Sequence, residues 1–386
     1  MNTYIYIKSF LALIFIYVIL LFLSLSMPSY KLSEHVRGAQ EILLRDGVYP
    51  HVNKDIPVTQ LDNFTDLQVM VPRLLVNNSP LIHSMDMNGY ARYWHGYTVF
   101  LRPLLSIFTI PQIRVIYGIA IAVLICSVFC VLSRTLNHGA AISFAIAMSM
   151  AHSEIFGQSM QFSNVFIITM LFMIFLSKKM EEIKYSFNKI PIYFFVVGSV
   201  VNFVDLLTVP IVSLSIPMIM VIYYINNANA VSAKNASLLV IKCSIAWAFG
   251  YGMTWIAKWV VATLILMRNV SSEAINQIFF RVMGDGDFPT NRIYTLLINF
   301  EGLFINRWVV LVIAFLFITA FLLYKRIKTS YTIPLFIVFS MPYVWYIALA
   351  NHSQIHAFFT FRAQVGSMMV CIILIELILK NIKRRT

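Results

Sequence analysis

The chain has 386 residues, of which 60% are hydrophobic and 12% are charged, and its mean hydropathy is +0.79. Soluble domains carry about 25% charged residues, so this composition excludes an ordinary soluble protein. The formal net charge of +13 does not indicate nucleic-acid binding, because the basic residues are spread over short segments between apolar runs, as the positive-inside rule predicts.

Apolar runs long enough to cross a bilayer as a helix recur along the chain. The first run ends without a small-residue cleavage pattern, so we interpret it as a retained span. We predict an all-α, polytopic membrane protein with a single integral-membrane domain over residues 1–386. About ten transmembrane helices are expected, at 5–27, 112–133, 138–156, 162–177, 190–207, 209–225, 237–266, 304–324, 332–350 and 363–380. The shorter run at 97–110 is interrupted by Arg102 and Pro103 and is expected to be a dipping or interfacial helix.

Basic residues orient these spans. Three groups of them, and the C-terminal group, fall on one side when ten spans alternate: Lys178, Lys179, Lys184 and Lys189; Lys234; Lys325, Arg326 and Lys328; and Lys380, Lys383, Arg384 and Arg385. That side, which also holds both termini, is predicted to be cytoplasmic. The opposite side then has large outer loops at 28–111 and 267–303 and a shorter one at 351–362. The mixed helical spacing of LSEHVRGAQEILLRDG predicts interfacial helices in the first of these loops.

Polar motifs collect on the predicted outer face. They include QLDNFTD at 60–66, ARYWHGY at 91–97, MGDGDFPTNR at 283–292 and NHSQIHAFFTFR at 351–362. A transporter needs polar groups along a path through the bilayer, whereas this chain gathers them at one mouth. The pattern favours an enzyme that works at a membrane surface.

Two carboxylates stand out in the first outer loop. Asp62 and Asp66 are four residues apart and would share one face of a helical turn. A sugar-transferring enzyme needs a base for the acceptor hydroxyl, and Asp or Glu commonly serves. The alternative is a solvated loop carboxylate or a helix N-cap. Glu154 and Asp205, near outer span ends, could serve the site or pair with a basic neighbour.

Cations on the outer side are candidates for holding a phosphate leaving group, since Arg and Lys suit that anion. These are Arg92, Arg102, Arg281, Arg292 and Arg362. Lys258 lies within an apolar span, where a buried ammonium needs a phosphate or carboxylate partner, or snorkels to the surface.

Histidines and aromatic residues complete the candidate set. His95, His352 and His356 are candidates for phosphate or hydroxyl contacts. The i, i+4 spacing of the last two also suits a metal, but no accompanying glutamate motif is present, and we predict no metal ligands. Tyr93 and Trp94 would stack on a sugar ring or belong to the interfacial aromatic belt.

With these motifs in place, the chain resembles the GT-C superfamily of integral-membrane glycosyltransferases. The resemblance is architectural, covers most of the chain, and includes QLDNFTD, ARYWHGY and ANHSQIHAFFTFR. In kind, the chain is similar to serotype-converting O-antigen glucosyltransferases. The resemblance implies inverting transfer from a polyprenyl-phosphate sugar, with a base in the first outer loop. Members often place that acid soon after the first span, so Glu34, Asp62 and Asp66 all stay open. A divalent metal is used by only part of the superfamily.

We therefore expect a bacterial inner-membrane enzyme that transfers a sugar from undecaprenyl phosphate to a glycan or lipid-linked glycan acceptor on the outer face. Asp62 or Asp66 would be the base, and Lys258, Arg102 or Arg362 would meet the phosphate. The rival functions are a polysaccharide polymerase or other lipid-linked transferase, and a transporter or flippase. A separate flippase and a donor synthase are the companions that the resemblance implies.

Overall fold

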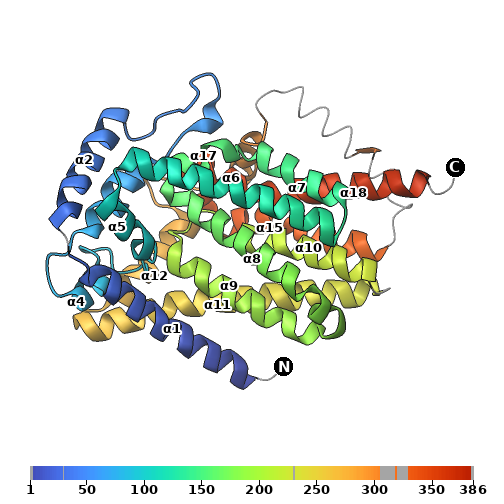
Figure 1. Cartoon of the computed structure of the whole chain (residues 1–386), viewed down its shortest axis with the longest axis horizontal. Coiled ribbons are helices and arrows are strands. Elements are labelled where there is room, and N and C mark those ends of the chain that lie inside the picture. The colour runs from blue at the N-terminus through green and yellow to red at the C-terminus, as the bar shows by residue number, and fades with distance from the viewer. Residues whose placement is uncertain (1–2, 29, 229–230, 305–317, 320–328, 384–386) are drawn as a thin grey trace.

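Helices make up the regular structure of the chain. The computed structural model describes residues 3–28, 30–228, 231–304, 318–319 and 329–383. These residues form helices joined by turns, with two isolated β-bridges and no strand. Most of the long helices run along one direction, which is horizontal in Figure 1. The prediction of an all-α protein is confirmed for the described residues.

Seven segments of the described chain are long and apolar enough to cross a membrane, so the polytopic class is confirmed. They are α1 (Thr3–Ser26), α6 (Ile110–Thr135), Met160–Ile183 of α8 (Met160–Tyr185), Phe187–Val204 containing α9 (Ile190–Val204), α11 (Ala233–Leu266), Ser330–Ala348 of α15 (Thr329–Ala348), and Ala357–Lys380 containing most of α18 (Val365–Lys383). The predicted spans at 138–156 and 209–225 correspond to shorter apolar helices, α7 (His138–Met150) and α10 (Val212–Ala228). The predicted span at 304–324 lies almost wholly outside the described residues. The count of ten is therefore not confirmed.

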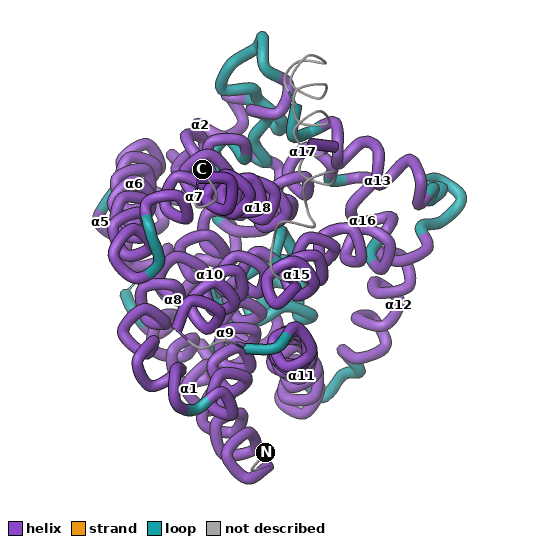
Figure 2. The backbone as a smooth tube through the Cα atoms, turned by 90° about the vertical axis from the view of Figure 1, so that its right-hand side faces the viewer, coloured by secondary structure: helices purple, strands orange, loops and turns teal. Residues whose placement is uncertain are grey.

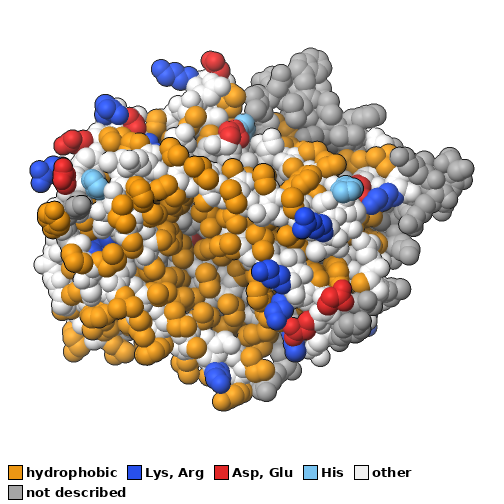
Figure 3. Space-filling view, in the orientation of Figure 1, with side chains coloured by type: hydrophobic (Ala, Val, Ile, Leu, Met, Phe, Trp, Pro, Cys, Tyr) orange, Lys and Arg blue, Asp and Glu red, His pale blue; other side chains and the backbone are white. Residues whose placement is uncertain are grey.

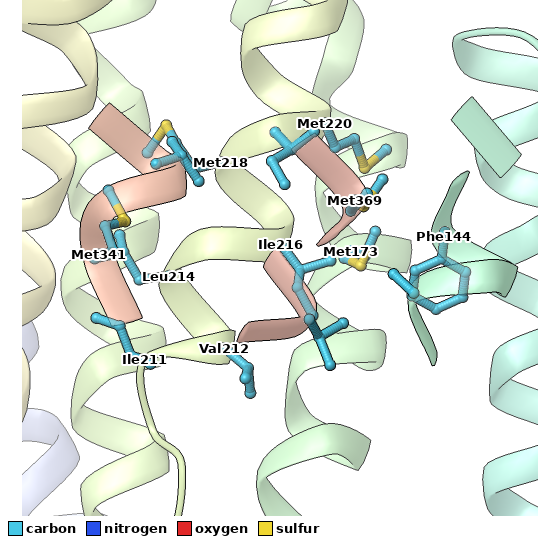
Figure 4. Packing of buried hydrophobic residues seen from close by; sticks show 14 of the residues in the cluster. Phe144, Met173, Ile211, Val212, Leu214, Ile216, Met218, Met220, Met341 and Met369 are labelled. Atoms are coloured by element: carbon cyan, nitrogen blue, oxygen red, sulfur yellow. The ribbon is translucent and has the colours of Figure 1, made fainter. Parts of the chain in front are cut away.

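Helix α10 lies at the centre of the bundle. All of its residues from Val212 to Tyr223 are buried, and it packs against α8, α9, α11, α15 and α18, as the end-on view of Figure 2 shows for its nearer neighbours. Met218, Met220, Met341 and Met369 gather around it (Figure 4). Methionine fills irregular gaps well, and such gaps are expected here because Pro217 interrupts the helical hydrogen bonding of α10.

Two glycines let α9 and α11 approach each other closely. A Cβ added at Gly198 would lie 2.4 Å from the Trp247 carbonyl oxygen, and one at Gly250 would lie 2.0 Å from the Phe195 carbonyl oxygen. Small residues at such crossings allow backbones to touch, as is common between membrane helices. This crossing holds the middle of α9 against the middle of α11.

Short helices cover one end of the bundle, which we call the loop end. They include α2 (Tyr30–Asp46), η1 (Pro57–Thr59), α3 (Asn63–Thr65), η2 (Asp66–Met70), η3 (Pro72–Leu74), α4 (Pro80–Asp86), α5 (Thr98–Ile107), η4 (Ser153–Gln158), α12 (Val270–Met283), α13 (Arg292–Glu301), α16 (Ala350–Ile355), α17 (Ala357–Thr360) and η7 (Phe361–Gln364). In Figure 1, α2, α4 and α5 lie at the left, while α1 and α18 point their chain ends toward the right. Figure 3 shows a broad hydrophobic surface between charged groups at the upper left and toward the right.

Helix α2 is amphipathic, but its apolar face meets protein. Leu32, Val36, Ala39 and Leu43 are all buried, and α2 packs against α5 and η2. Its polar positions, such as Arg37, face outward and are exposed. Packing on the protein therefore accounts for the amphipathic pattern that predicted an interfacial helix.

Candidate active site

Asp62 is held by the turn that it begins. The loop after α2 ends at Asp62, which caps the single turn α3. The Thr65 backbone N–H donates to Asp62 Oδ1 at 2.9 Å, and the Thr65 hydroxyl donates to Oδ2 at 2.8 Å. The side chain is buried, and burial raises its pKa while the Thr65 donors oppose the rise. The N-cap alternative therefore describes Asp62 well.

Asp66, one turn later, has no such support. It begins η2, a π-helical turn in which the Val71 N–H donates to the Asp66 carbonyl at 2.9 Å. Its carboxylate is fully buried, and neither oxygen accepts a hydrogen bond in good geometry from any described residue. π-Turns recur at functional sites, and a buried polar group without a partner costs free energy that a structural role does not repay. Asp66 is therefore the stronger candidate for chemistry.

The groups around Asp66 act on its pKa in opposite directions. Burial raises the pKa of Asp66 to about 7, and Asp62 adds to the rise. The Arg114 guanidinium and the Met160 N–H, at the start of α8, act in the opposite direction. The N–H lowers the pKa because a helix N-terminus attracts negative charge. With a net pKa of about 7, the Asp66 carboxyl can exchange a proton near neutral pH.

Sequence reasoning missed Arg114, because it lies inside a run assigned to a membrane span. One of its terminal nitrogens donates to Asn63 Oδ1 at 3.0 Å and the other lies 3.5 Å from Asp46 Oδ2. Gly157 brings the start of α8 close to α6, since a Cβ there would lie 2.6 Å from Gly118 Cα. The signal in the sequence is a basic residue in the first turns of an apolar helix. Its position next to the acidic motif at 60–66 is visible only in the structure.

A cation–aromatic cluster is formed by residues of η3 and of the loop before α5, and we define it as Arg73, Tyr90, Arg92 and Tyr93. The two guanidinium groups lie over the Tyr90 ring at 4.9 and 4.0 Å, and Tyr90 stacks on Tyr93 with centroids 5.6 Å apart. Arg92 also donates to Glu273 Oε1 at 2.8 Å. Arg73 Nε is buried without an acceptor among the described residues. The cluster has positive charge and a free donor, which suit an anion.

The rest of the ARYWHGY motif builds this loop. Trp94 Nε1 donates to the Thr254 carbonyl at 2.7 Å. His95 adopts a left-handed backbone with φ 56°, and its ring nitrogens lie 2.9 Å from the Tyr90 carbonyl and 3.0 Å from the Tyr97 hydroxyl. Burial lowers the pKa of His95 well below its usual value. These contacts use both ring nitrogens and favour a structural role for a neutral imidazole.

Three cations expected at a phosphate instead donate to backbone carbonyls. Arg102 donates to the carbonyls of Leu74, at 2.9 Å, and Ser24. Lys258 Nζ donates to those of Ser84 and Met85 at 2.9 and 3.1 Å. Arg362 donates to those of Val58, Ala151 and Phe358, each at 3.0 Å. All three side chains are fully buried. These contacts join segments of the loop end and do not favour phosphate binding.

Two other candidates lie at the surface. Glu154 Oε1 lies 2.7 Å from His152 Nδ1 and the side chain is 61% exposed, so pairing with a basic neighbour describes it. Arg292 begins α13 and is exposed. Neither contacts the buried carboxylates in the described contacts.

Asp205 and the two late histidines form a separate polar cluster. Asp205 ends α9, and its carboxylate accepts from the Thr208 N–H at 2.9 Å and from the Thr208 hydroxyl. Burial raises its pKa to about 7. His356 Nε2 accepts from Arg281 at 3.0 Å, and burial together with Arg281 lowers the pKa of His356 to about 3. His352 is buried, and neither of its ring nitrogens has a well-formed hydrogen bond to a described residue.

This pair of histidines does not complete a metal site. The two rings lie 4.9 Å apart, but the described residues include no group of three or more His, Cys, Asp or Glu side chains that could hold a metal ion.

Comparison of the chain with protein-family models, curated proteins and solved structures finds no match. The loop end offers a buried carboxylate, Asp66, that accepts no well-formed hydrogen bond from a described residue and has a pKa near neutrality, with the Arg114 guanidinium acting on it. It also offers the cation–aromatic cluster on the segment that follows. Such a pairing suits proton removal beside an anionic leaving group.

Proposed function

We propose that the protein transfers a sugar from a polyprenyl-phosphate donor, such as an undecaprenyl-phosphate sugar, to a hydroxyl of a cell-surface glycan. The reaction would take place at the loop end, on the outer face of a bacterial cytoplasmic membrane. The observation that carries the proposal is the buried carboxylate of Asp66, which accepts no well-formed hydrogen bond from a described residue and has a pKa of about 7.

Asp66 is assigned the role of general base. It accepts the proton of the acceptor hydroxyl while the hydroxyl oxygen forms a bond to the anomeric carbon. The bond between that carbon and the phosphate oxygen breaks, and the lipid phosphate leaves with the electron pair. A single displacement of this kind inverts the anomeric centre. Because Asp66 is fully buried here, the acceptor reaches it only after the segments around it open.

The cation–aromatic cluster is assigned to the donor phosphate. Arg73 has an unused donor, and Arg92 is only partly neutralised by Glu273, whose side chain is 36% exposed. The Arg fork matches phosphate geometry, and the charge that develops on the leaving group is the charge such donors stabilise. One terminal nitrogen of Arg73 donates to the Gln68 and Val69 carbonyls, so its Nε is the donor that is left over. The assignment replaces Arg102, Lys258 and Arg362, which also donate to backbone carbonyls but are not paired with a second guanidinium over one tyrosine ring.

A transfer assay tests the proposal. Purified protein in nanodiscs would receive radiolabelled undecaprenyl-phosphate sugars from a panel, together with cell-envelope glycan. We expect label to appear in the glycan with at least one donor. Asp66→Asn should transfer at least about 100-fold more slowly, the usual contribution of a general base, while still binding donor.

Asp287→Asn is the matched control, since Asp287 is an exposed carboxylate on the loop between α12 and α13 and should transfer normally. Joining of two lipid-linked glycans without label transfer from single-sugar donors would favour the polymerase alternative. Movement of intact donor across proteoliposomes without transfer would favour a flippase. Equal transfer by Asp66→Asn and wild type would reject Asp66 as the base.

A further inference from the structure

An open cleft of about 710 Å³ is lined by Leu61, the residue before Asp62, and by Arg114. It is formed by the loop after α2, the first turns of α6 and the end of η4. Its lining consists of Asp46, Pro50, His51, Val52, Lys54, Leu61, Arg114 and Gln158. The volume is within the range of small-molecule sites, and the open side leaves room for a longer chain to extend into solvent.

Two lining residues connect the cleft to the segment that carries the candidate base. Leu61 directly precedes Asp62, and its N–H donates to the Pro50 carbonyl at 2.8 Å across the cleft loop. Arg114 lines the cleft and also acts electrostatically on Asp66. A ligand in the cleft therefore lies next to the segment that carries the base.

The cleft carries more positive than negative charge. Its one carboxylate, Asp46, already lies 3.5 Å from both Arg45 and Arg114. Lys54 is exposed and forms no ion pair within the described residues. Arg114 is only 13% exposed, and its Nε is buried without an acceptor. A ligand in the cleft therefore meets two cations, the exposed Lys54 and the mostly buried Arg114.

We infer that this cleft binds the acceptor glycan through an anionic group on that glycan, a carboxylate or a phosphate. Arg114 and Lys54 meet the anion, and Gln158 offers an amide to neighbouring hydroxyls. That the bound glycan is the acceptor rests on the proposed function, whereas binding of the anionic glycan can be measured without turnover.

Calorimetric binding to the full-length protein in phosphatidylcholine nanodiscs tests this inference. The probes are tetragalacturonate, its fully methyl-esterified and therefore neutral form, and maltotetraose with and without a 6-phosphate. We expect wild type to bind one or both anionic probes at least about 5-fold more tightly than the neutral form with the same backbone. The carboxylate and phosphate arms distinguish the two sources of the anion.

The variant Lys54→Glu should remove most of that preference, by about 5-fold, the upper range for an exposed charge pair. Arg37→Glu is the matched control, because Arg37 is an exposed cation on α2 outside the cleft. This variant should prefer anionic over neutral probes as strongly as wild type does. Equal affinity for charged and neutral probes, no binding of any probe, or an unchanged preference in Lys54→Glu would each overturn the inference. Failure of sugar transfer with intact anionic preference would reject the proposed function alone.

Discussion

Asp62 and Asp66 are four residues apart and both buried, yet they differ in what surrounds their oxygens. Thr65 satisfies Asp62, whereas no described group hydrogen-bonds Asp66 in good geometry. Asp205 offers a useful comparison, because burial raises its pKa to about 7 as well, but Thr208 donates to both of its oxygens. At this scale, the number of hydrogen bonds separates a carboxylate that supports the fold from one available for chemistry.

The same substitution should therefore stabilise the folded chain more at Asp66 than at Asp205. The folded chain holds the Asp66 proton up to about pH 7, while the unfolded chain releases it near 3.8. Stability accordingly falls as pH rises from about 4 to 7 and is lowest above 7. At pH 8, Asp66→Asn should raise the free energy of unfolding by about 1–3 kcal/mol, within the roughly 4 kcal/mol that such a shift allows.

Burial raises the pKa of Asp205 to about 7 as well, so removing its charge at pH 8 also favours folding. Asp205→Asn should nevertheless gain about 1–3 kcal/mol less than Asp66→Asn, because its amide NH₂ would face one of the two Thr208 donors. Denaturation of both variants in mixed detergent at pH 8 gives the comparison. A loss of stability in Asp66→Asn would contradict the account of an unsupported carboxylate.

Lys258 shows how one residue in a long helix secures a short one. α4 has seven residues, and isolated helices of that length are not stable in water. Lys258 on α11 donates to the Ser84 and Met85 carbonyls in its last turn, where carbonyls lack helical partners and favour a cation. α4 is thus held through its C-terminus by a helix distant in sequence.

We predict that Lys258→Met increases amide hydrogen exchange in α4, because two carbonyls lose their donor and the local opening free energy falls by about 1–3 kcal/mol. Lys242→Met, an exposed position on the same helix, is the matched control and should leave α4 protected. Exchange measured by mass spectrometry over peptides covering 80–86 gives the result. Unchanged protection in Lys258→Met would mean that apolar packing alone holds α4.

The whole molecule has its short polar helices at one end and the chain ends of α1 and α18 toward the other (Figure 1). If the loop end faces outward, as the distribution of Lys and Arg predicts, Lys54 and Lys189 lie on opposite sides of the membrane. In intact cells, Lys54→Cys should react with a membrane-impermeant maleimide, and Lys189→Cys should react only after permeabilisation. The wild-type chain controls for its four native cysteines. Labelling of Lys189→Cys alone would reverse the predicted orientation.

Membrane class and helix positions could be predicted because apolar length is a local property of the sequence. The predicted spans at 138–156 and 209–225 correspond to the shorter apolar helices α7 and α10. Hydropathy alone does not show that α10 is enclosed by other helices. The acidic motif was also visible, but the contacts that separate Asp66 from Asp62 depend on α6 and α8, which lie about 50 and 95 residues further along the chain. The sequence predicts ligand binding by Arg102, Lys258 and Arg362 from their residue type alone. The backbone carbonyls that they contact instead carry no signal in the sequence.

The most direct test of the account is the pH dependence of sugar transfer by the reconstituted protein between pH 5.5 and 8.5. Asp66 must be ionised to accept a proton, so kcat/KM should rise about tenfold per unit below pH 7 and level off above it. Asp205→Asn should keep the same midpoint, and Asp66→Asn should lose both the activity and the titration. A pH-independent rate, or a midpoint near 7 that persists in Asp66→Asn, would contradict the assignment of Asp66 as the base.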